Sequence, residues 1–288
     1  MSWSLGYTPA SRPKRAACMN APLANPASLP LLHERSGSVA VLTLNRIAAR
    51  NSLSEAVLTA FGDAFSDISS DRGVRAVVIA AHGPAFCAGH DLKELTARRA
   101  DPDGGRAYFK QIMLACSAVM QMIVRLPQPV IAAVEGVATA AGCQLVASCD
   151  LAVAARNARF ATPGVDIGLF CSTPMVALSR NVSRKHAMEM LLTGEMISAE
   201  DAARMGLVNR VVEPGHAKVE ALALAERIAS KAGAVVKLGK GAFYRQNEMA
   251  LADAYSYASE IMVENMMVGD ANEGICAFLE KRKPVWEN

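Results

Sequence analysis

The chain has 288 residues, of which 52% are hydrophobic and 20% are charged, with 20 glycines and 13 prolines. This composition is typical of a globular protein and excludes collagen-like, low-complexity and mainly disordered classes. Thirty Lys and Arg against 27 Asp and Glu leave a net charge of +3, so we expect no nucleic-acid partner. Charges, Gly or Pro interrupt every apolar run before the ~20 residues of a membrane span, so we expect none.

The cysteine pattern points to reduced thiols rather than to disulfides or a metal. There are seven cysteines, an odd number, with no CxxC pair. No His/Cys cluster has the spacing of zinc ligands, so we expect no metal. Several cysteines, such as Cys116 and Cys276, lie in apolar runs and are expected in the core. We expect a cytoplasmic location, with the mitochondrial matrix as the alternative.

Residues 1–35 are expected to form a mobile N-terminal tail. The first 30 residues contain no Asp or Glu and carry basic residues at 12, 14 and 15. Such a start is typical of a mitochondrial transit peptide, but five prolines would break the amphipathic helix that one needs. Met19 is an alternative translation start, so residues 1–18 need not belong to the natural protein.

From Ser36 onward, strand and helix patterns alternate. Apolar and β-branched runs predict strands at 38–45, 74–81 and 129–136, and two shorter strands within 150–157 and 158–165. Helices are predicted at about 51–71, with Ser54 as the N-cap, and at 107–126. This alternation predicts right-handed crossovers and a mainly parallel sheet in an α/β core over 36–212.

The C-terminal part, 213–288, is predicted to be helical and to serve oligomerisation. Strands mostly stop at about residue 172. Ser198 with Asp201 three residues later forms an acidic variant of the capping box. For the Met-rich stretch 258–270 we favour a core position, with an oligomer contact as the alternative.

Two Gly-rich loops, 82–95 and 135–150, directly follow predicted strands. Small residues at 137 and 139–142 allow a ligand to approach backbone N–H groups closely. A helix opening at about Ala140 would point such donors outward, with the helix dipole behind them. The pattern indicates an anion or oxyanion site at the carboxyl ends of the strands. The nucleotide motifs GxGxxG and GxxxxGK[ST] are absent.

Six segments carry a family resemblance: LNRIAARNSLS (44–54), AFCAGHDLKEL (85–95), PVIAAVEGVATAAGCQLVASCDLAVA (129–154), RFATPGVDIGL (159–169), LLTGEMISAEDAARMGLVNRVV (191–212) and EGICAFLEKRKPVW (273–286). From about Ser36 to the C-terminus the chain resembles the enoyl-CoA hydratase/isomerase (crotonase) superfamily. GHDLKEL, AAGCQLVASCD and ATPGVDIGLFCSTP resemble most the branch called enoyl-CoA hydratase domain-containing protein 3.

The resemblance implies an α/β fold, a ClpP-like spiral of βαβ units with a helical trimerisation region. It also implies a homotrimer or dimer of trimers, and a lyase or isomerase of fatty acid metabolism. The ligand would be an acyl-coenzyme A thioester, with coenzyme A as part of the substrate and no cofactor bound permanently. The thioester oxygen would lie in an oxyanion hole formed by the amides of His90 and Ala141, provided that the φ angle of Ala141 is negative.

Coenzyme A contacts are carried over by motif onto Ala88, His90, Asp91, Leu92, Lys93, Arg46, Arg50, Lys281 and Lys283. The alternative for Lys281 and Lys283 is a solvated helix end favoured by the macrodipole. The alternative for Asp91 is a short polar side chain that bonds its own loop.

One departure from the family pattern decides the expected chemistry. Hydratases of this family use two glutamates, and those positions hold Gln144 and Gly164 here. Neither residue can transfer a proton, so hydration of crotonyl-CoA is expected to be very slow or absent. Asp166 would face the same side as residue 164 in an extended segment and is a candidate replacement.

His90, at the mouth of the oxyanion hole, is a second candidate for proton transfer. A nucleophile built from Cys143 or Cys171 with a histidine is a guess from proximity alone, and Asp150 is expected to be structural. Two functions stay open: a thioester enzyme working through an enolate or tetrahedral oxyanion, decarboxylation included, or a non-catalytic acyl-CoA binder or scaffold.

Overall fold

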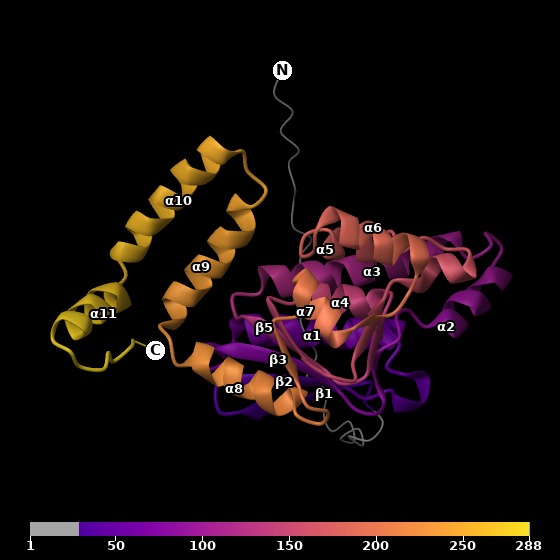
Figure 1. Ribbon diagram of the computed structural model, residues 1–288, viewed down its shortest axis with the longest axis horizontal. Coiled ribbons are helices and arrows are strands. Elements are labelled where there is room, and N and C mark those ends of the chain that lie inside the picture. Colours follow the sequence, from indigo (N-terminus) through magenta and orange to yellow (C-terminus); the bar gives the residue numbers. More distant parts are fainter. Residues whose placement is uncertain (1–28, 288) are drawn as a thin grey trace, which may run out of the picture.

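The computed structural model describes residues 29–287, and the expected tail over 1–28 lies outside them. The main sheet has six strands in the order β1-β2-β3-β5-β7-β10 (Figure 1). All neighbours are parallel except the antiparallel pair β1–β2, so the prediction of a mainly parallel sheet is confirmed. The strands are β1 (Leu31–Ser36), β2 (Val39–Leu44), β3 (Ala76–Ala81), β5 (Val130–Val134), β7 (Leu151–Ala155) and β10 (Arg210–Val212).

Strand β1 corrects the predicted tail, which was expected to extend to residue 35. Its register places Leu31 opposite Leu44 and Ser36 opposite Val39, with the turn at Gly37, whose φ is 58°. Only Leu31 is buried, and the last four residues of the strand are exposed. An edge strand with so little buried surface carries no alternating apolar pattern, so the sequence could not indicate it.

A smaller four-stranded sheet, ordered β4-β6-β8-β9, continues from the first. Its strands are β4 (Ala85–Cys87), β6 (Val137–Thr139), β8 (Arg159–Ala161) and β9 (Ile197–Ser198). The chain passes from β3 to β4, from β5 to β6 and from β7 to β8, each time with only two or three residues between the strands. This repeated step winds the βαβ units into a spiral and brings the two predicted loops to one edge.

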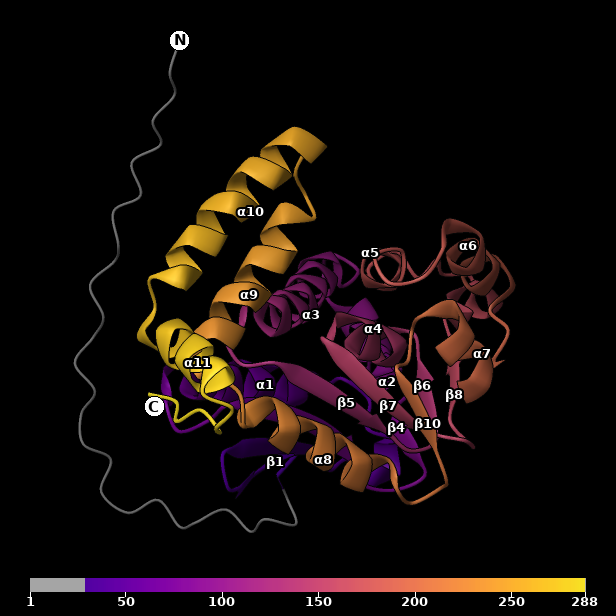
Figure 2. The same ribbon diagram turned by 60° about the vertical axis from the view of Figure 1, so that its left-hand side comes forward.

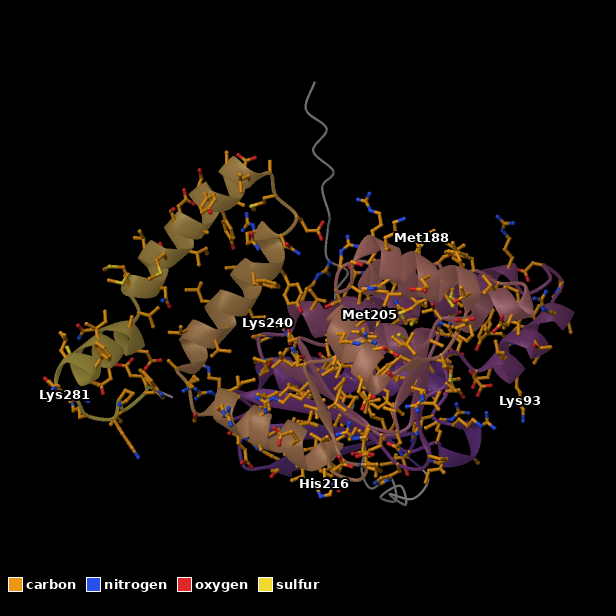
Figure 3. All side chains as sticks on the ribbon, in the orientation of Figure 1. Lys93, Met188, Met205, His216, Lys240 and Lys281 are labelled. Atoms are coloured by element: carbon orange, nitrogen blue, oxygen red, sulfur yellow. The ribbon has the colours of Figure 1, made fainter. Side chains whose placement is uncertain are left out.

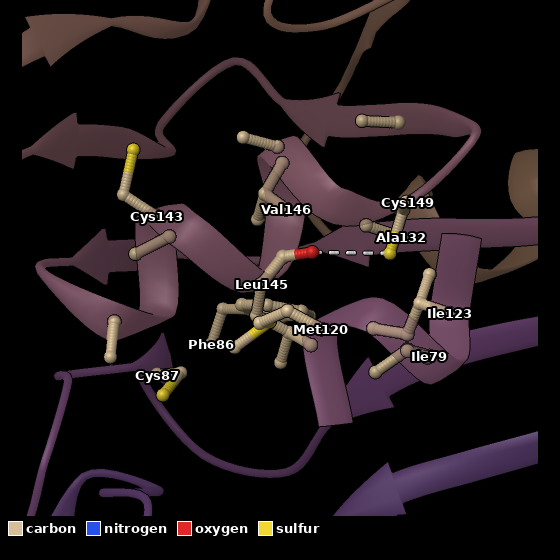
Figure 4. Packing of buried hydrophobic residues seen from close by; sticks show 14 of the residues in the cluster. Ile79, Phe86, Cys87, Met120, Ile123, Ala132, Cys143, Leu145, Val146 and Cys149 are labelled. Atoms are coloured by element: carbon tan, nitrogen blue, oxygen red, sulfur yellow. Dashed lines mark hydrogen bonds between the residues drawn. The ribbon is translucent and has the colours of Figure 1, made fainter. Parts of the chain in front are cut away.

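Helices cover both faces of the main sheet. One face packs on α1 (Glu55–Ser70), α3 (Arg106–Arg125) and α4 (Ala141–Ser148), and the other packs on α8 (Ala217–Ala229) (Figure 2). All six residues of β2 are buried, as expected for a strand covered on both faces. Figure 4 shows Leu145 of α4 among Phe86, Met120 and Ala132.

Local helix signals in the sequence are confirmed. The Ser54 hydroxyl accepts a hydrogen bond from the Val57 amide, which caps α1. Ser198 and Asp201 form the reciprocal capping box of α7. The remaining helices of the body are α2 (Leu92–Ala97), α5 (Pro174–Leu178), α6 (Arg184–Thr193) and α7 (Ala199–Met205), with short 3-10 helices η2 (Ile47–Ala49), η3 (Arg98–Ala100) and η4 (Pro163–Ile167).

Helix α3 departs from one prediction. By length and composition alone its 20 residues could cross a membrane, whereas the sequence analysis expected no such segment. Here α3 packs against α1 and α4 and buries an apolar stripe that includes Cys116 and Ile123. A core helix has the same features, so this helix by itself does not show a membrane span.

The C-terminal arm, residues 233–287, stands away from the body (Figure 1). It contains α9 (Gly233–Gln246), α10 (Leu251–Met266) and α11 (Gly269–Leu279). Neither α9 nor α10 has a buried residue, and Met262, Met266 and Met267 are exposed. The predicted core position of the Met-rich stretch is therefore wrong within this chain, because these side chains stay more than half exposed although α10 contacts α9 and α11. Cys276 is likewise only partly buried.

Candidate functional site

The first Gly-rich loop turns the His90 amide away from its neighbour Leu53. The Leu53 amide donates to the Gly89 carbonyl at 2.7 Å, and the Asp91 amide donates to the Leu53 carbonyl at 3.3 Å. These two bonds form a backbone bridge between Leu53 and His90. Neither the His90 N–H nor any side chain takes part in it. Because successive residues of an extended segment face opposite ways, the His90 N–H points to the other side of the loop.

The second loop enters α4 through a strained residue. Ala140 has φ 50° and ψ −118°, a conformation that favours glycine. Its amide donates to Ala161 at 2.9 Å, and its carbonyl accepts from Gln144 at 3.0 Å, so bonds on both sides hold it. Ala141 is not among the residues with positive φ, which meets the condition set for its role. Strain of this kind costs about 1–3 kcal/mol and is concentrated at functional sites.

The two loops pack closely because glycines stand at their contact. A β-carbon added to Gly89, whose φ is 96°, would lie 3.0 Å from the Ala140 β-carbon and 3.5 Å from the Ala141 nitrogen. One added to Gly142 would overlap the Cys87 carbonyl. Within residues 29–287, neither the His90 nor the Ala141 amide donates to a protein acceptor. Two free N–H groups therefore lie on adjacent loops, and the Ala141 group is at the positive end of α4.

Several polar atoms around this contact are buried without a partner. They include both ring nitrogens of His90, the Gln144 Oε1 and the Thr162 Oγ1. Burial lowers the pKa of His90, and the nearby Leu53 backbone only partly opposes this shift. The imidazole is therefore neutral at pH 7. Buried polar groups without partners cost free energy, and a polar ligand would satisfy them. Sequence reasoning did not single out Thr162.

Gln144 and Gly164 stand at the two positions that the family resemblance assigns to carboxylates, and their surroundings differ. Gln144 is only 5% exposed and keeps a full-length side chain. At Gly164, an added β-carbon would lie 2.8 Å from the Leu169 carbonyl oxygen and 2.9 Å from the Cys171 sulfur. A side chain at 164 therefore requires the backbone to move. The residues that fill this space lie five and seven positions later, so no local signal indicated them.

Asp166 does not lie where the sequence analysis placed it. Residues Pro163–Ile167 form a 3-10 helix rather than an extended segment, so residues 164 and 166 do not face the same side. Asp166 is exposed, and its carboxylate oxygens lie 3.1 and 3.3 Å from the point where a β-carbon on Gly194 would stand. The structure thus places this carboxylate at the end of α6.

The cysteines near the site are protonated thiols. Burial raises the pKa of Cys143 to about 12, and burial likewise raises the pKa of Cys171. Cys87, Cys116 and Cys149 are also buried and free, which confirms the core prediction for these five residues. A thiolate nucleophile has no support here, because a buried thiol of raised pKa is inert. Within residues 29–287, no three His, Cys, Asp or Glu side chains are grouped to hold a metal.

Asp91 and Arg46 hold the first loop rather than facing solvent. The Asp91 carboxylate accepts from the Lys93 and Glu94 amides and caps α2, as its structural alternative predicted. Arg46 forms an ion pair with Asp91 at 2.9 Å and donates to the Ser52 carbonyl. Partial burial opposes ionisation, but the hydrogen bonds and charge of Arg46 and the α2 amides keep the pKa of Asp91 below its ordinary value.

The candidate phosphate contacts do not all come together. Arg50 and Lys93 are exposed beside the first loop, as is Leu92, whereas Ala88 and His90 are partly buried. Lys281 lies at the opposite end of the longest axis of the molecule from Lys93 (Figure 3), and Lys283 follows two residues later. Within one chain these two lysines therefore cannot share a ligand with Lys93. A hollow of about 410 Å³ between the body and α9 is lined by residues such as Gln128 and Lys237. No residue of the two Gly-rich loops lines it.

Comparisons with known proteins identify similar sequences and structures. A sequence model of the family described as "Enoyl-CoA hydratase/isomerase" matches residues 34–288. The rat protein named "Enoyl-CoA hydratase domain-containing protein 3, mitochondrial" is 46% identical over 267 residues, which cover 92% of this chain and 87% of the rat protein.

Two solved structures are similar over most of their length. An enoyl-CoA hydratase of Mycobacterium smegmatis has 56% identity and a TM-score of 0.86, covering 90% of this chain and 99% of that one. Human enoyl Coenzyme A hydratase domain-containing protein 3 has 47% identity and a TM-score of 0.85, covering 89% of this chain and 100% of that one.

Proposed function

This chain belongs to the enoyl-CoA hydratase/isomerase family, and on that premise we propose that it binds acyl-coenzyme A thioesters and holds the thioester carbonyl oxygen on the amides of His90 and Ala141. The observation that carries the proposal is the pair of free N–H groups on two adjacent loops. Removing one donor of such a pair typically slows catalysis by ~10²–10³. Because the donors belong to the backbone, unusual side chains at 90 and 141 leave both N–H groups in place.

The two carboxylates that ordinary hydration uses are missing from this site, and of the candidate replacements only the neutral His90 imidazole keeps free nitrogens there. Addition of water to an enoyl thioester needs groups that activate the water and exchange the proton. Gln144 and Gly164 cannot do so, Asp166 lies beside Gly194, and the Cys143 thiol stays protonated. We therefore expect slow or absent hydration. Reactions that place charge on the carbonyl oxygen without a carboxylate base, such as loss of CO₂ from the acyl group, fit the site better.

A non-catalytic acyl-CoA binder or scaffold is the second candidate function. The packing of Cys171 and Leu169 against Gly164 supports it, because the space that a catalytic side chain would occupy is filled. Both candidates share the thioester ligand and differ only in turnover. A panel of enoyl, acyl and carboxyacyl thioesters separates them: product formation from any of these supports the enzyme, and binding without product supports the binder.

The coenzyme would lie along the first loop, from Ala88 through Lys93, with no cofactor bound permanently. Arg50 and Lys93 are the exposed cations there, while Arg46 contributes by holding Asp91 in place. Lys281 and Lys283 would reach a coenzyme only from a second copy of the chain. This fits a homotrimer or dimer of trimers in which the apolar surface of the C-terminal arm is covered. We propose no nucleic-acid partner.

The names of the vertebrate relatives support the mitochondrial alternative over the cytoplasmic location that we expected from the cysteines. A tagged chain located by fractionation, with and without residues 1–30, tests this. Import that depends on those residues supports a matrix protein, and cytosolic recovery of both versions contradicts it.

The decisive experiment measures what the carbonyl oxygen contributes to binding. Titration calorimetry with butyryl-CoA and with S-butyl-CoA, a thioether that lacks the carbonyl, gives an affinity ratio that we name the carbonyl preference. We expect a preference of about thirtyfold, since each of the two hydrogen bonds contributes ~1 kcal/mol. Ala141→Pro deletes one donor at a helix position that tolerates proline and should lower the preference about fivefold, since the His90 donor remains. Ala141→Gly and His90→Ala keep their N–H groups and should retain it. Equal affinities for the two ligands in the unmodified protein would contradict the proposal.

A further inference from the structure

Three side chains tie the C-terminal arm to the body in one buried network. Lys240 and Tyr244, one turn apart on α9, both bind Asp150 in the turn after α4. The Lys240 Nζ lies 2.7 Å from the Asp150 Oδ2, and the Tyr244 hydroxyl donates to the Asp150 Oδ1 at 2.9 Å. Figure 3 shows Lys240 at the side of α9 that faces the body. We name Lys240, Tyr244 and Asp150 the α9 clamp.

Every donor of the Lys240 ammonium group is used. Besides Asp150, it donates to the Ile123 carbonyl at 2.9 Å and to the Gln128 carbonyl at 3.0 Å. Its side chain is 7% exposed, and that of Asp150 is 15% exposed. Three donors matched to three fixed acceptors leave one position for this side chain. The acceptors lie in the last turn of α3, just before β5 and just after α4. The three hydrogen bonds therefore fix the position of α9 relative to these elements.

Asp150 also connects α9 to the end of α4. Its Oδ2 accepts from the Val130 amide at 2.6 Å, and its own amide donates to the Val130 carbonyl at 2.9 Å. The carboxylate therefore fixes the chain directly after α4 against the start of β5. Helix α4 has eight residues and a length of ~12 Å, and its other end is Ala141. A short hydrogen-bonded helix moves as a unit, so a shift at its last turn also displaces its first residue.

Other links between body and arm are weaker. Arg180 and Glu248 form an ion pair at 3.2 Å, but both side chains are more than half exposed, and such pairs contribute little. A buried ion pair, in turn, adds little to stability after desolvation and acts mainly through the geometry that it imposes. The clamp is therefore suited to set an orientation.

We propose that Lys240 and Tyr244 are positioning residues for the thioester site: through Asp150 they hold the end of α4, so that the C-terminal arm and the Ala141 amide are placed together. This inference rests on the role given to Ala141 in the proposed function. It links the state of the arm, and hence its coverage by another copy, to the geometry of the oxyanion hole some 12 Å away along α4.

The test compares the carbonyl preference of clamp variants with that of a matched control. Tyr244→Phe deletes one hydroxyl, and Lys240→Met removes the ammonium group while keeping the length of the side chain. Lys237→Met makes the same change one turn earlier on α9, where the lysine is exposed and has no ion-pair partner among residues 29–287. We expect Lys240→Met to lower the carbonyl preference by up to about fivefold, the effect of losing the Ala141 donor, Tyr244→Phe to lower it by a smaller factor, and Lys237→Met to leave it unchanged. The affinity for S-butyl-CoA should stay within twofold throughout.

The outcomes separate this inference from the proposed function. A lowered preference in the clamp variants, together with faster hydrogen exchange in 141–148, supports positioning. An unchanged preference in Tyr244→Phe and Lys240→Met overturns it and leaves the clamp a structural tie. If Lys240→Met does not fold, Tyr244→Phe alone decides. A lack of carbonyl preference in the unmodified protein defeats the proposed function itself, and the hydrogen exchange of α4 then reports whether the clamp controls that helix.

Discussion

The sulfur of Cys171 lies 2.9 Å from the point at which a β-carbon on Gly164 would stand, so residues 164 and 171 compete for one space. The Leu169 carbonyl oxygen lies 2.8 Å from the same point. A backbone carbonyl cannot swing aside as the end of a flexible side chain can. A side chain that begins at position 164 would therefore have to displace this backbone carbonyl.

A side chain at position 164 should consequently destabilise the protein. We expect Gly164→Ala to lower the free energy of unfolding by about 1–3 kcal/mol, as overpacking does in a dense core. Gly62→Ala is the matched control, because nothing lies within 4 Å of a β-carbon there and Ala favours the helix. Urea unfolding of both variants measures the difference. Equal stabilities would show that the Leu169 carbonyl yields.

Restoring both glutamates should fail to restore hydration. In Gln144→Glu/Gly164→Glu the first side chain has room, but the second must displace Leu169 or Cys171. We expect no gain in crotonyl-CoA hydration over Gln144→Glu alone, measured by loss of the enoyl thioester absorbance. A gain of a hundredfold or more would mean that the pocket still accepts the family's usual pair of carboxylates.

Glycine should be better than alanine at position 140. Ala140 is held at φ 50°, so Ala140→Gly relieves strain of about 1–3 kcal/mol while adding the entropic cost of a glycine, about 0.5–1 kcal/mol. We expect a net stabilisation in thermal unfolding. The neighbouring Ala141→Gly is the control and should be slightly destabilising, because the φ of Ala141 is already negative. Destabilisation of the same size by both variants would contradict the assigned strain.

The clamp lysine should make stability rise with pH in the alkaline range. Burial lowers the pKa of Lys240 from its ordinary value of 10.5, and Asp150 only partly opposes this shift. Between the lowered folded pKa and 10.5 the unfolded chain binds more protons, so stability increases as the pH rises through this window. The buried thiols, whose pKa values burial raises, make stability fall over the same range, so urea unfolding at several pH values below 10 should show the lysine contribution only as a more positive slope in the protein and in Lys237→Met. Lys240→Met should lack it, and an identical slope in all three would contradict the assignment.

The arm should be the assembly surface. Met267 is 80% exposed and Phe278 is 82% exposed, which is unusual for large apolar side chains that serve no contact. We expect sedimentation to give a trimer or a dimer of trimers, and Met267→Glu or Phe278→Glu to shift it toward smaller species. Val219→Glu, on α8 and also well exposed, is the control. A stable monomer at micromolar concentration would contradict the role given to the arm.

Elements whose signals are local could be predicted from the sequence alone. Strand periodicity, the Ser54 cap, the Ser198–Asp201 capping box and the two Gly-rich loops depend on residues within a few positions of one another, and all lie as predicted. The family motifs singled out His90 and Ala141, and the structure places their amides on two loops in contact, while their role at a thioester stays a prediction.

Only the tertiary structure decided features that depend on distant partners. Strand β1 forms because β2 pairs with its backbone, although its own side chains remain exposed. Asp166 is turned away by the 3-10 helix, and Gly164 is enclosed by Leu169 and Cys171. Lys240 meets Asp150 across 90 positions of sequence. Such contacts join residues that are far apart in the sequence and meet only in the folded chain. An exposed edge strand or a lysine in a polar helix has no sequence pattern that indicates its partner.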